Sequence, residues 1–212
     1  MITLGIVAQK GGVGKTTIAA MIGTAYANAQ WKVLLADMDS SQNSLVEWNI
    51  FRQKHSIKPA LNVKSYNRVS DALEEASSYD IIILDGAPHA SQATAEIAAV
   101  ADLVILPTGA SIMDLNPQIK LAHELTEQGL KAERLLFVLN RIGQSKVEQK
   151  EAIDYLIKTG YPVLGDGIAE KTAFRRAFIE GKSLTEVPYA TLRKKCEKLL
   201  QAIVDRINTI TS

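Results

Sequence analysis

The chain of 212 residues has little cysteine, little histidine and no long apolar run, and each shortage excludes a class of protein. Its single cysteine, Cys196, cannot form an intramolecular disulfide bond, which fits a reducing cytoplasm. Apolar stretches such as 81–84 and 103–106 are far shorter than the ~20 residues that a membrane-spanning helix needs. The histidines lack metal-ligand spacing, so the sequence encodes no metal cage: His55, His89 and His123.

Low-complexity tracts and a targeting segment are also missing. The chain is 47% hydrophobic and has no Pro-rich or Gly/Ser-rich tract, which excludes a disordered protein. Residues 1–7 lack the basic region of a secretory signal and predict a buried strand instead. Because no linker divides the sequence, we expect one domain over residues 1–212.

The charge is nearly balanced but unevenly placed. The net charge is +1, which by itself implies no polyanionic partner. Residues 171–212 contain nine Lys or Arg and four Asp or Glu, a net charge of +5, so residues 1–170 carry −4. The C-terminal segment is therefore the basic part of the chain.

Short apolar runs alternate with longer segments of helical period, a pattern that predicts an α/β fold with a mostly parallel central sheet and helices on both faces. The runs are uniformly apolar, as strands buried on both faces require. The expected strands are 2–8, 33–37, 60–65, 81–85, 103–107, 135–140 and 162–164. The expected helices are 16–29, 44–54, 69–78, 90–101, 117–128, 146–158, 172–180 and 190–209.

A glycine-rich loop follows the first strand and leads directly into a helix. Such a loop lets backbone N–H groups converge on phosphate oxygens, while a lysine contacts the β- and γ-phosphates and a hydroxyl holds Mg²⁺. A glycine turn that merely links strand to helix is the alternative. The loop predicts a P-loop NTPase whose nucleotide-binding residues are Gly11, Gly12, Val13, Gly14, Lys15, Thr16 and Thr17, with Thr16 at the metal.

The loop departs from the ordinary P-loop pattern at Gln9, where glycine is usual, and at the second lysine, Lys10. It resembles the deviant Walker A box, Lys-Gly-Gly-x-Gly-Lys-Thr-Thr, of the ParA/MinD family of dimerising ATPases. In that family the extra lysine reaches across the interface to the nucleotide of the partner subunit. The resemblance implies that Lys10 and Lys15 are both catalytic and that dimerisation depends on ATP.

Two carboxylates end the second strand, at the carboxyl edge where parallel sheets bind ligands. A spacing of two along an extended strand places Asp37 and Asp39 on the same side. One can serve the Mg²⁺ shell while the other orients the attacking water, although an ordinary Asp-rich turn would look the same. The family motif, Asp-x-Asp-Pro-Gln, implies a metal role for Asp37 and a catalytic role for Asp39. Residues 40–42 depart from that motif.

Three further strand ends carry candidate residues. Asp85 closes an apolar run and is suited to Mg²⁺ as a Walker B acid, with a helix cap as the competing role. Pro107 and Asp114 resemble the switch segment of the family, which responds to nucleotide and meets the partner subunit. Asn140 stands at a strand end where its amide could contact adenine, as the equivalent residue does in some relatives.

The resemblance covers nearly the whole chain, including residues 174–187, and is closest to a small ParA without an N-terminal helix-turn-helix domain. It implies a cytoplasmic, nucleoid-associated ATPase that uses ATP and Mg²⁺, forms a homodimer and binds DNA without sequence preference. Hydrolysis would be stimulated by a ParB-like or small centromere-binding partner, and the cargo would be a plasmid, a chromosome region or another body. The basic segment supplies the expected DNA-binding residues: Arg175, Arg176, Arg193, Lys194, Lys195 and Lys198.

Two other functions remain open from the sequence. A MinD-like positioning ATPase would bind membranes through an amphipathic helix, and residues 199–207 do have an apolar stripe at helical spacing. That stripe lacks aromatic anchors and a strongly basic tip, and a stripe of this width is more often the packed face of a final helix, so no membrane partner is expected. A P-loop kinase or synthetase would need a second-substrate motif, which the chain does not show. An iron–sulfur relative is excluded because one cysteine cannot supply the ligands.

Overall fold

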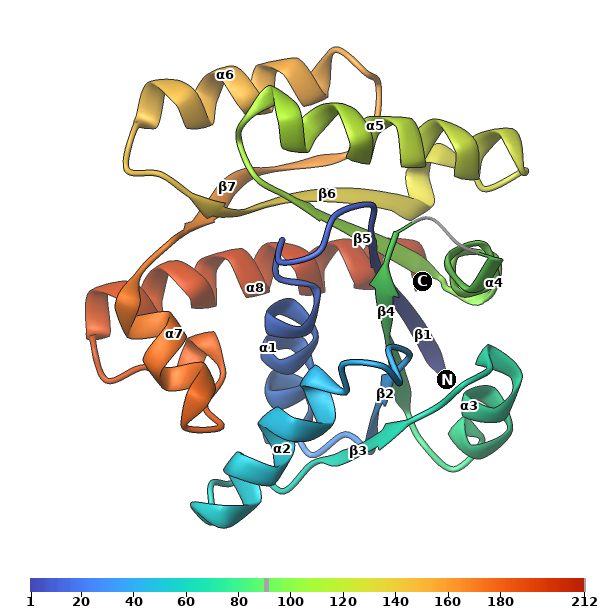
Figure 1. The fold of residues 1–212 in the computed structure, drawn as a ribbon, viewed down its shortest axis with the longest axis vertical. Coiled ribbons are helices and arrows are strands. Elements are labelled where there is room, and N and C mark those ends of the chain that lie inside the picture. Colours follow the sequence, from blue (N-terminus) through green and yellow to red (C-terminus); the bar gives the residue numbers. More distant parts are fainter. Residues whose placement is uncertain (90–91, 212) are drawn as a thin grey trace.

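The computed structural model describes residues 1–89 and 92–211, which fold around one seven-stranded sheet (Figure 1). The strand order is β3-β2-β4-β1-β5-β6-β7, and every neighbouring pair is parallel. The expected parallel α/β fold is therefore confirmed. The strands are β1 (Ile2–Ala8), β2 (Val33–Asp37), β3 (Asn62–Ser65), β4 (Ile81–Pro88), β5 (Leu103–Thr108), β6 (Leu135–Ile142) and β7 (Val163–Ala169).

Helices cover both faces of the sheet. One apolar cluster joins it to α1 (Lys15–Asn28), α2 (Ser44–Lys54), α7 (Thr172–Ile179) and α8 (Ala190–Thr211). The other joins it to α3 (Val69–Ala76), α4 (Gln92–Val100), α5 (Ile112–Glu127) and α6 (Lys146–Ile157). Two short 3₁₀ turns complete the described structure, η1 (Ala132–Arg134) and η2 (Leu184–Glu186).

The two clusters explain why the strands are uniformly apolar. Along β4, Ile81 and Ile83 pack into the first cluster, whereas Ile82 and Leu84 pack into the second. All four side chains are fully buried. Successive side chains of a strand point to opposite faces, so a sheet covered on both sides needs an apolar residue at every position.

Several expected element ends were wrong. The helix expected to begin at Pro117 begins five residues earlier, at Ile112, and Pro117 lies inside α5. Proline favours a helix start because it cannot donate a hydrogen bond to the preceding turn, but here the turn before Pro117 is helical as well. β3 is shorter than expected, and β4 and β7 are longer. The expected start of a helix at residue 90 lies outside the described residues, and α4 is described from Gln92.

The C-terminal helix packs its apolar stripe against the sheet. Leu199, Ile203 and Ile207 of α8 are buried in the first cluster. The apolar stripe of residues 199–207, which in the sequence was also compatible with a membrane-binding helix, is thus the core-facing side of α8. Among residues 1–89 and 92–211, no helix is long and apolar enough to cross a membrane.

Candidate nucleotide-binding site

The loop between β1 and α1 contains two glycines in a left-handed conformation. The φ angle is +76° at Gly12 and +94° at Gly14, a region that side chains rarely adopt. A Cβ atom on Gly14 would also lie 1.8 Å from Nδ2 of Asn140. Because α1 begins at the next residue, Lys15, the loop combines a glycine backbone with a helix N-terminus, the arrangement that binds phosphate groups.

Lys15 is buried at the base of this loop and only 8% exposed. Burial lowers the pKa of its amine, while the negative charges of Asp85 and Asp39 oppose that shift. A lysine at this position presents its ammonium group to the pocket rather than to bulk water. Such a cation is suited to the terminal phosphates of a nucleotide.

Asp85, which lies within β4, has the most strongly perturbed carboxyl group of the site. It is 3% exposed, and burial raises its pKa to about 7, while a hydrogen bond from Thr16 and the charge of Lys15 oppose the shift. One of its oxygens, Oδ1, is buried without a hydrogen-bond partner. A buried carboxylate oxygen without a partner, beside a threonine hydroxyl, is the donor set that a divalent cation takes.

No compact cage of side chains accompanies this position. Within residues 1–89 and 92–211, no group of three or more His, Cys, Asp or Glu could hold a metal ion. Magnesium usually keeps several waters and is bound by one or two carboxylates together with substrate phosphates. The pair Thr16 and Asp85 fits that mode, in which the nucleotide supplies part of the coordination.

Asp37 does more than face the pocket. Its Oδ1 accepts from the backbone N–H of Asp39 at 3.1 Å, and its Oδ2 accepts from Leu45 at 2.9 Å and Val46 at 3.3 Å. Burial raises the pKa of Asp37, and these hydrogen bonds partly oppose the rise. Asp37 therefore ties the end of β2 to the first turn of α2. Its predicted metal contact stays a prediction.

Asp39 lies beside Asp37 in the pocket for a different reason from the one expected. β2 ends at Asp37, so strand alternation does not extend to Asp39. The chain instead turns on the Asp37 hydrogen bond, and Asp39 Oδ1 accepts from the Ser41 hydroxyl at 2.6 Å and from the Gln42 backbone at 3.2 Å. The unusual residues 40–42 thus hold the Asp39 carboxylate through their own donors, and both acids line the pocket.

The second lysine of the loop is held by its own chain. Lys10 Nζ lies 2.9 Å from Oδ1 of Asp114 in the first turn of α5. The Ser111 hydroxyl donates to the other oxygen of Asp114 at 2.7 Å. Burial would raise the pKa of Asp114, but the hydrogen bonds from Ser111 and Lys10 hold it below its usual value. The predicted switch residue Asp114 thus contacts the predicted cross-subunit lysine.

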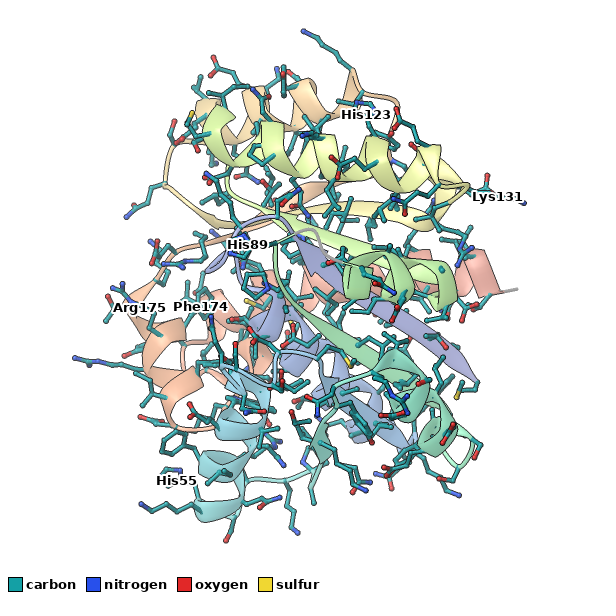
Figure 2. All side chains as sticks on the ribbon, turned by 45° about the vertical axis from the view of Figure 1, so that its right-hand side comes forward. His55, His89, His123, Lys131, Phe174 and Arg175 are labelled. Atoms are coloured by element: carbon teal, nitrogen blue, oxygen red, sulfur yellow. The ribbon has the colours of Figure 1, made fainter. Side chains whose placement is uncertain are left out.

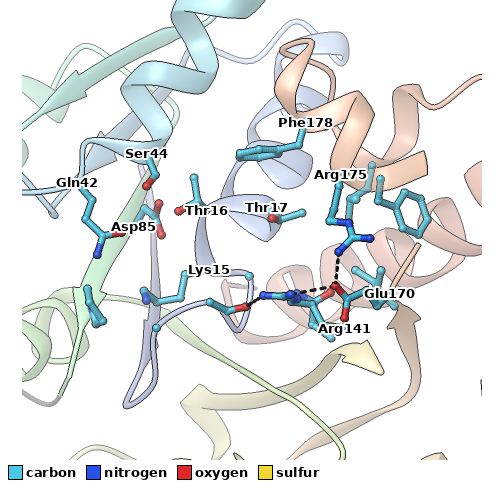
Figure 3. A pocket seen from close by; sticks show the side chains of 18 of the residues that line it. Lys15, Thr16, Thr17, Gln42, Ser44, Asp85, Arg141, Glu170, Arg175 and Phe178 are labelled. Carbon is cyan, nitrogen blue, oxygen red and sulfur yellow. Dashed lines mark hydrogen bonds and ion pairs between the residues drawn. The ribbon is translucent and has the colours of Figure 1, made fainter. Parts of the chain in front are cut away.

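Lys15, Thr16, Asp37, Asp39 and Asp85 line one cavity of about 440 Å³. Figure 3 shows its wall running from Lys15 and Thr16 to side chains of α7. The far wall comes from the C-terminal segment, through Phe174 and Phe178. The sequence analysis singled out residues at the glycine-loop end of this pocket and missed the apolar wall, which lies more than 150 residues further along the chain.

A charged cluster at the mouth of the pocket was also missed. Arg141 donates to the backbone oxygen of Gly12 and, at 2.9 Å, to Glu170. Arg175 on α7 lies 3.4 Å from the same carboxylate (Figure 3). Arg141 has a φ of +55°, an uncommon value for a residue other than glycine. The only signal in the sequence was its position directly after Asn140 at a strand end.

Asn140 is buried against the phosphate loop. Its Nδ2 donates to the backbone oxygen of Val13 at 2.7 Å. This bond fixes the loop just before Gly14. The side chain lines the cavity as well, and its predicted contact with adenine stays a prediction.

The predicted DNA-binding residues fall into two groups. Arg176, Lys194 and Lys195 are exposed on α7 and α8. The other three make contacts within the chain: Arg175 pairs with Glu170, Arg193 lies 3.6 Å from Glu197, and Lys198 lies 2.7 Å from Asp166. Part of the positive charge expected from the sequence is therefore neutralised locally. Figure 2 shows Arg175 on α7 next to Phe174, and the three histidines in separate parts of the molecule.

Comparison with known proteins agrees with this geometry. A family model described as "CbiA: CobQ/CobB/MinD/ParA nucleotide binding domain" matches residues 4–184. The chain belongs to this family. The predicted ParA/MinD resemblance is thereby confirmed, and the glycine loop lies within the matched residues.

Two named proteins and one solved structure are similar to this member of the MinD/ParA family. The chain is 31% identical over 179 residues to maintenance of carboxysome distribution protein A of Gloeobacter kilaueensis, covering 84% of this chain and 81% of that protein. It is 30% identical over 166 residues to chromosome partitioning protein ParA of Myxococcus xanthus, covering 59% of each. The septum site-determining protein MinD of Pyrococcus horikoshii, complexed with Mg-ADP, has the same fold, with a TM-score of 0.73, 23% identity and 95% of each chain covered.

Proposed function

We propose that the protein is an ATPase of the ParA type that dimerises with ATP and positions a cargo. The observation that carries the proposal is a buried lysine and a buried carboxylate oxygen without a partner in one cavity, together with a second lysine on the same glycine loop. Lys15, Asp85 and Lys10 are those three groups. A merely structural turn would not keep two such charges buried without a ligand.

The phosphate loop would hold the nucleotide and Mg²⁺. Backbone N–H groups of residues 11–17 and the start of α1 bind the phosphate oxygens, and Lys15 neutralises the terminal phosphates. Thr16 and Asp85 hold Mg²⁺, with Asp37 close by. Bound Mg²⁺ supplies charge neutralisation at the β- and γ-phosphates. ATP is the proposed nucleotide because a neighbour of the same fold is a complex with Mg-ADP.

Asp39 would position the attacking water. Its Oδ1 is held by Ser41 and Gln42, so the carboxylate is oriented before substrate arrives. Phosphoryl transfer has little covalent chemistry for a protein to perform, and its catalysis consists mainly of positioning and charge stabilisation. Asp37 is the alternative for this role, although the Asp39 backbone N–H already occupies its Oδ1 and the first turn of α2 its Oδ2.

Dimerisation would depend on Lys10. In the single chain Lys10 pairs with Asp114, an ion pair that is partly exposed and therefore weak, worth at most about 1 kcal/mol. A triphosphate of a partner subunit carries more negative charge than one carboxylate. Lys10 can therefore leave Asp114 for the nucleotide of the partner, and this exchange couples ATP to the dimer.

DNA would bind the C-terminal segment without sequence preference. That segment carries a net charge of +5, and a dimer presents it twice. The carboxysome and chromosome relatives are named for distributing a cargo, which suggests the same class of work here. A ParB-like or small centromere-binding protein is the proposed activator, and the nucleoid is the proposed location.

The decisive test measures binding of duplex DNA with ATP and with ADP at several salt concentrations. Tight DNA binding with ATP but not with ADP supports the proposal. Substitution of Arg193, Lys194 and Lys195 by Glu should weaken DNA binding for all duplex sequences alike. If each side chain contacts one phosphate, the logarithmic salt slope falls by about 3. A matched control reverses three exposed lysines on the opposite face of the sheet, two in α6 and one directly after it: Lys146, Lys150 and Lys158. Equal losses in both triple variants would refute a DNA site on the basic segment.

A further inference from the structure

Gln118 of α5 is 2% exposed and makes two hydrogen bonds to the strand that leads into the phosphate loop. Its Nε2 donates to the backbone oxygen of Val7 at 2.9 Å. Its Oε1 accepts from the backbone N–H of Gln9 at 3.0 Å. One side-chain amide thus satisfies two backbone groups that lie on either side of the end of β1.

Gln118 replaces a missing strand neighbour. β1 pairs with β5 only from Leu4 to Ile6, whereas β5 continues along β6 as far as Thr108. The residue register between β1 and β5 ends at Ile6, and buried backbone groups past that point must be paired in another way. Glutamine carries a donor and an acceptor on one uncharged group, so it can take the place of both.

The same helix contacts the next residue of the loop. Asp114, one helical turn before Gln118, pairs with Lys10 at 2.9 Å. Residues four apart lie on one face of a helix. The first two turns of α5 therefore hold residues 7, 9 and 10 in sequence, through two side chains.

We propose that Gln118 is a positioning residue that fixes the direction in which the Lys10 side chain extends from the loop. The proposal rests on the proposed function of Lys10. The hydrogen bonds to Val7 and Gln9 fix the backbone immediately before Lys10, so its ammonium group starts from one defined position whether it contacts Asp114 or a partner nucleotide. Lys15 is held separately, by α1, and does not depend on Gln118.

The test replaces Gln118 by Met, which is similar in length but cannot donate or accept at the same places. Nucleotide affinity is measured by titration, ATP-dependent association by light scattering, kcat and KM by phosphate release, and folding by thermal melting. We expect nucleotide affinity within about threefold of wild type and kcat lower by about tenfold or more, because small misplacements of a catalytic group are costly. ATP-dependent association should weaken by a similar factor.

Two controls separate positioning from general support of the fold. Thr126→Val removes a 3.1 Å hydrogen bond to Tyr161 from the far end of the same helix and should leave kcat unchanged. Gln118→Asn keeps the amide but is one methylene shorter, so it cannot span both backbone groups and should behave like Gln118→Met. Recovery of wild-type kcat in Gln118→Asn would overturn the proposed geometry.

The remaining outcomes are also decisive. Wild-type kcat and association in Gln118→Met would overturn the inference. So would a parallel loss of nucleotide affinity and kcat, since Gln118 would then support the whole loop. The proposed function is judged on the wild-type protein alone. If the wild type hydrolyses ATP without associating, the proposed dimer is refuted. A comparison of kcat between Gln118→Met and Thr126→Val still decides the role of Gln118.

Discussion

A buried ion pair between α2 and the C-terminal segment is predicted to stabilise the pocket wall. The Arg52 side chain is 1% exposed and forms two hydrogen bonds to Glu186, at 2.7 and 2.9 Å. The guanidinium also donates to the backbone oxygens of Pro59 and Gly181, both at 3.1 Å, and lies 5.5 Å from the ring centre of Trp48. Four of the five N–H donors of the Arg52 guanidinium thus bind other parts of the chain.

Breaking this pair from one side should be costly. Arg52→Met removes the guanidinium that holds the pKa of Glu186 below its usual value against the effect of burial. Glu186→Ala leaves the Arg52 charge buried without its partner. Removal of one partner of a buried pair costs about 3–5 kcal/mol, a large share of the 5–15 kcal/mol that keeps a typical domain folded. For a chain of this length that is a fall in Tm of about 10 °C.

The double variant, Arg52→Met with Glu186→Leu, gives the sharper result. It leaves no unpaired charge, and apolar replacements of a buried pair are often close to neutral. We expect it to lose no more than about 2 kcal/mol, so the two single losses are strongly non-additive. The assay is urea unfolding at pH 7 with the slopes compared. Additive losses, or single losses below about 1 kcal/mol, would refute the reasoning.

Three further predictions concern the site. Lys15→Ala should abolish nucleotide binding, as nucleotide titration would show. Lys10→Ala should still bind nucleotide but should neither form dimers nor hydrolyse ATP, as light scattering and phosphate release would show. Normal ATP-dependent dimers of Lys10→Ala would contradict this prediction. Asp39→Ala should bind nucleotide and accumulate as an ATP dimer, and if only Asp37→Ala stops turnover, the two roles are exchanged. Because burial raises the pKa of Asp85 from 3.8 to about 7, the unfolded chain ionises first, and the metal-free protein should lose stability, up to about 4 kcal/mol, as pH rises from about 4 to 7. Asp85→Asn should not show that loss of stability. If wild type and Asp85→Asn have the same pH dependence in urea unfolding with EDTA, the raised pKa of Asp85 is refuted.

Local signals predicted the phosphate end of the site. The apolar run of β1, the glycines and Lys15 lie within one short stretch, and the backbone geometry they require involves few distant residues. Asp85 was found for the same reason, since it closes an apolar run directly. The parallel sheet was predicted from a separate local signal, the alternation of short apolar runs with segments of helical period.

Contacts between distant segments were beyond sequence reasoning. Gln118 and Val7 are 111 residues apart, and Arg52 and Glu186 are 134 apart. Nothing in the sequence around Gln118 or Arg52 distinguishes these two residues from ordinary polar positions on a helix. Pro117 was misread for a related reason: its missing N–H is tolerated inside α5, whose first turn is held by contacts with the loop residue Lys10.

The placement of α7 makes nucleotide and DNA binding interdependent if the proposed DNA site is right. Phe174 and Phe178 form the wall of the cavity, while Arg175 and Arg176 stand on the same two turns of helix. Arg175 reaches the nucleotide loop through Glu170 and Arg141. A ligand that shifts α7 from either side must change the affinity for the other by the same factor. DNA affinity measured at rising nucleotide concentration should therefore change, and a DNA affinity that is the same with and without nucleotide would show that α7 does not couple the two sites.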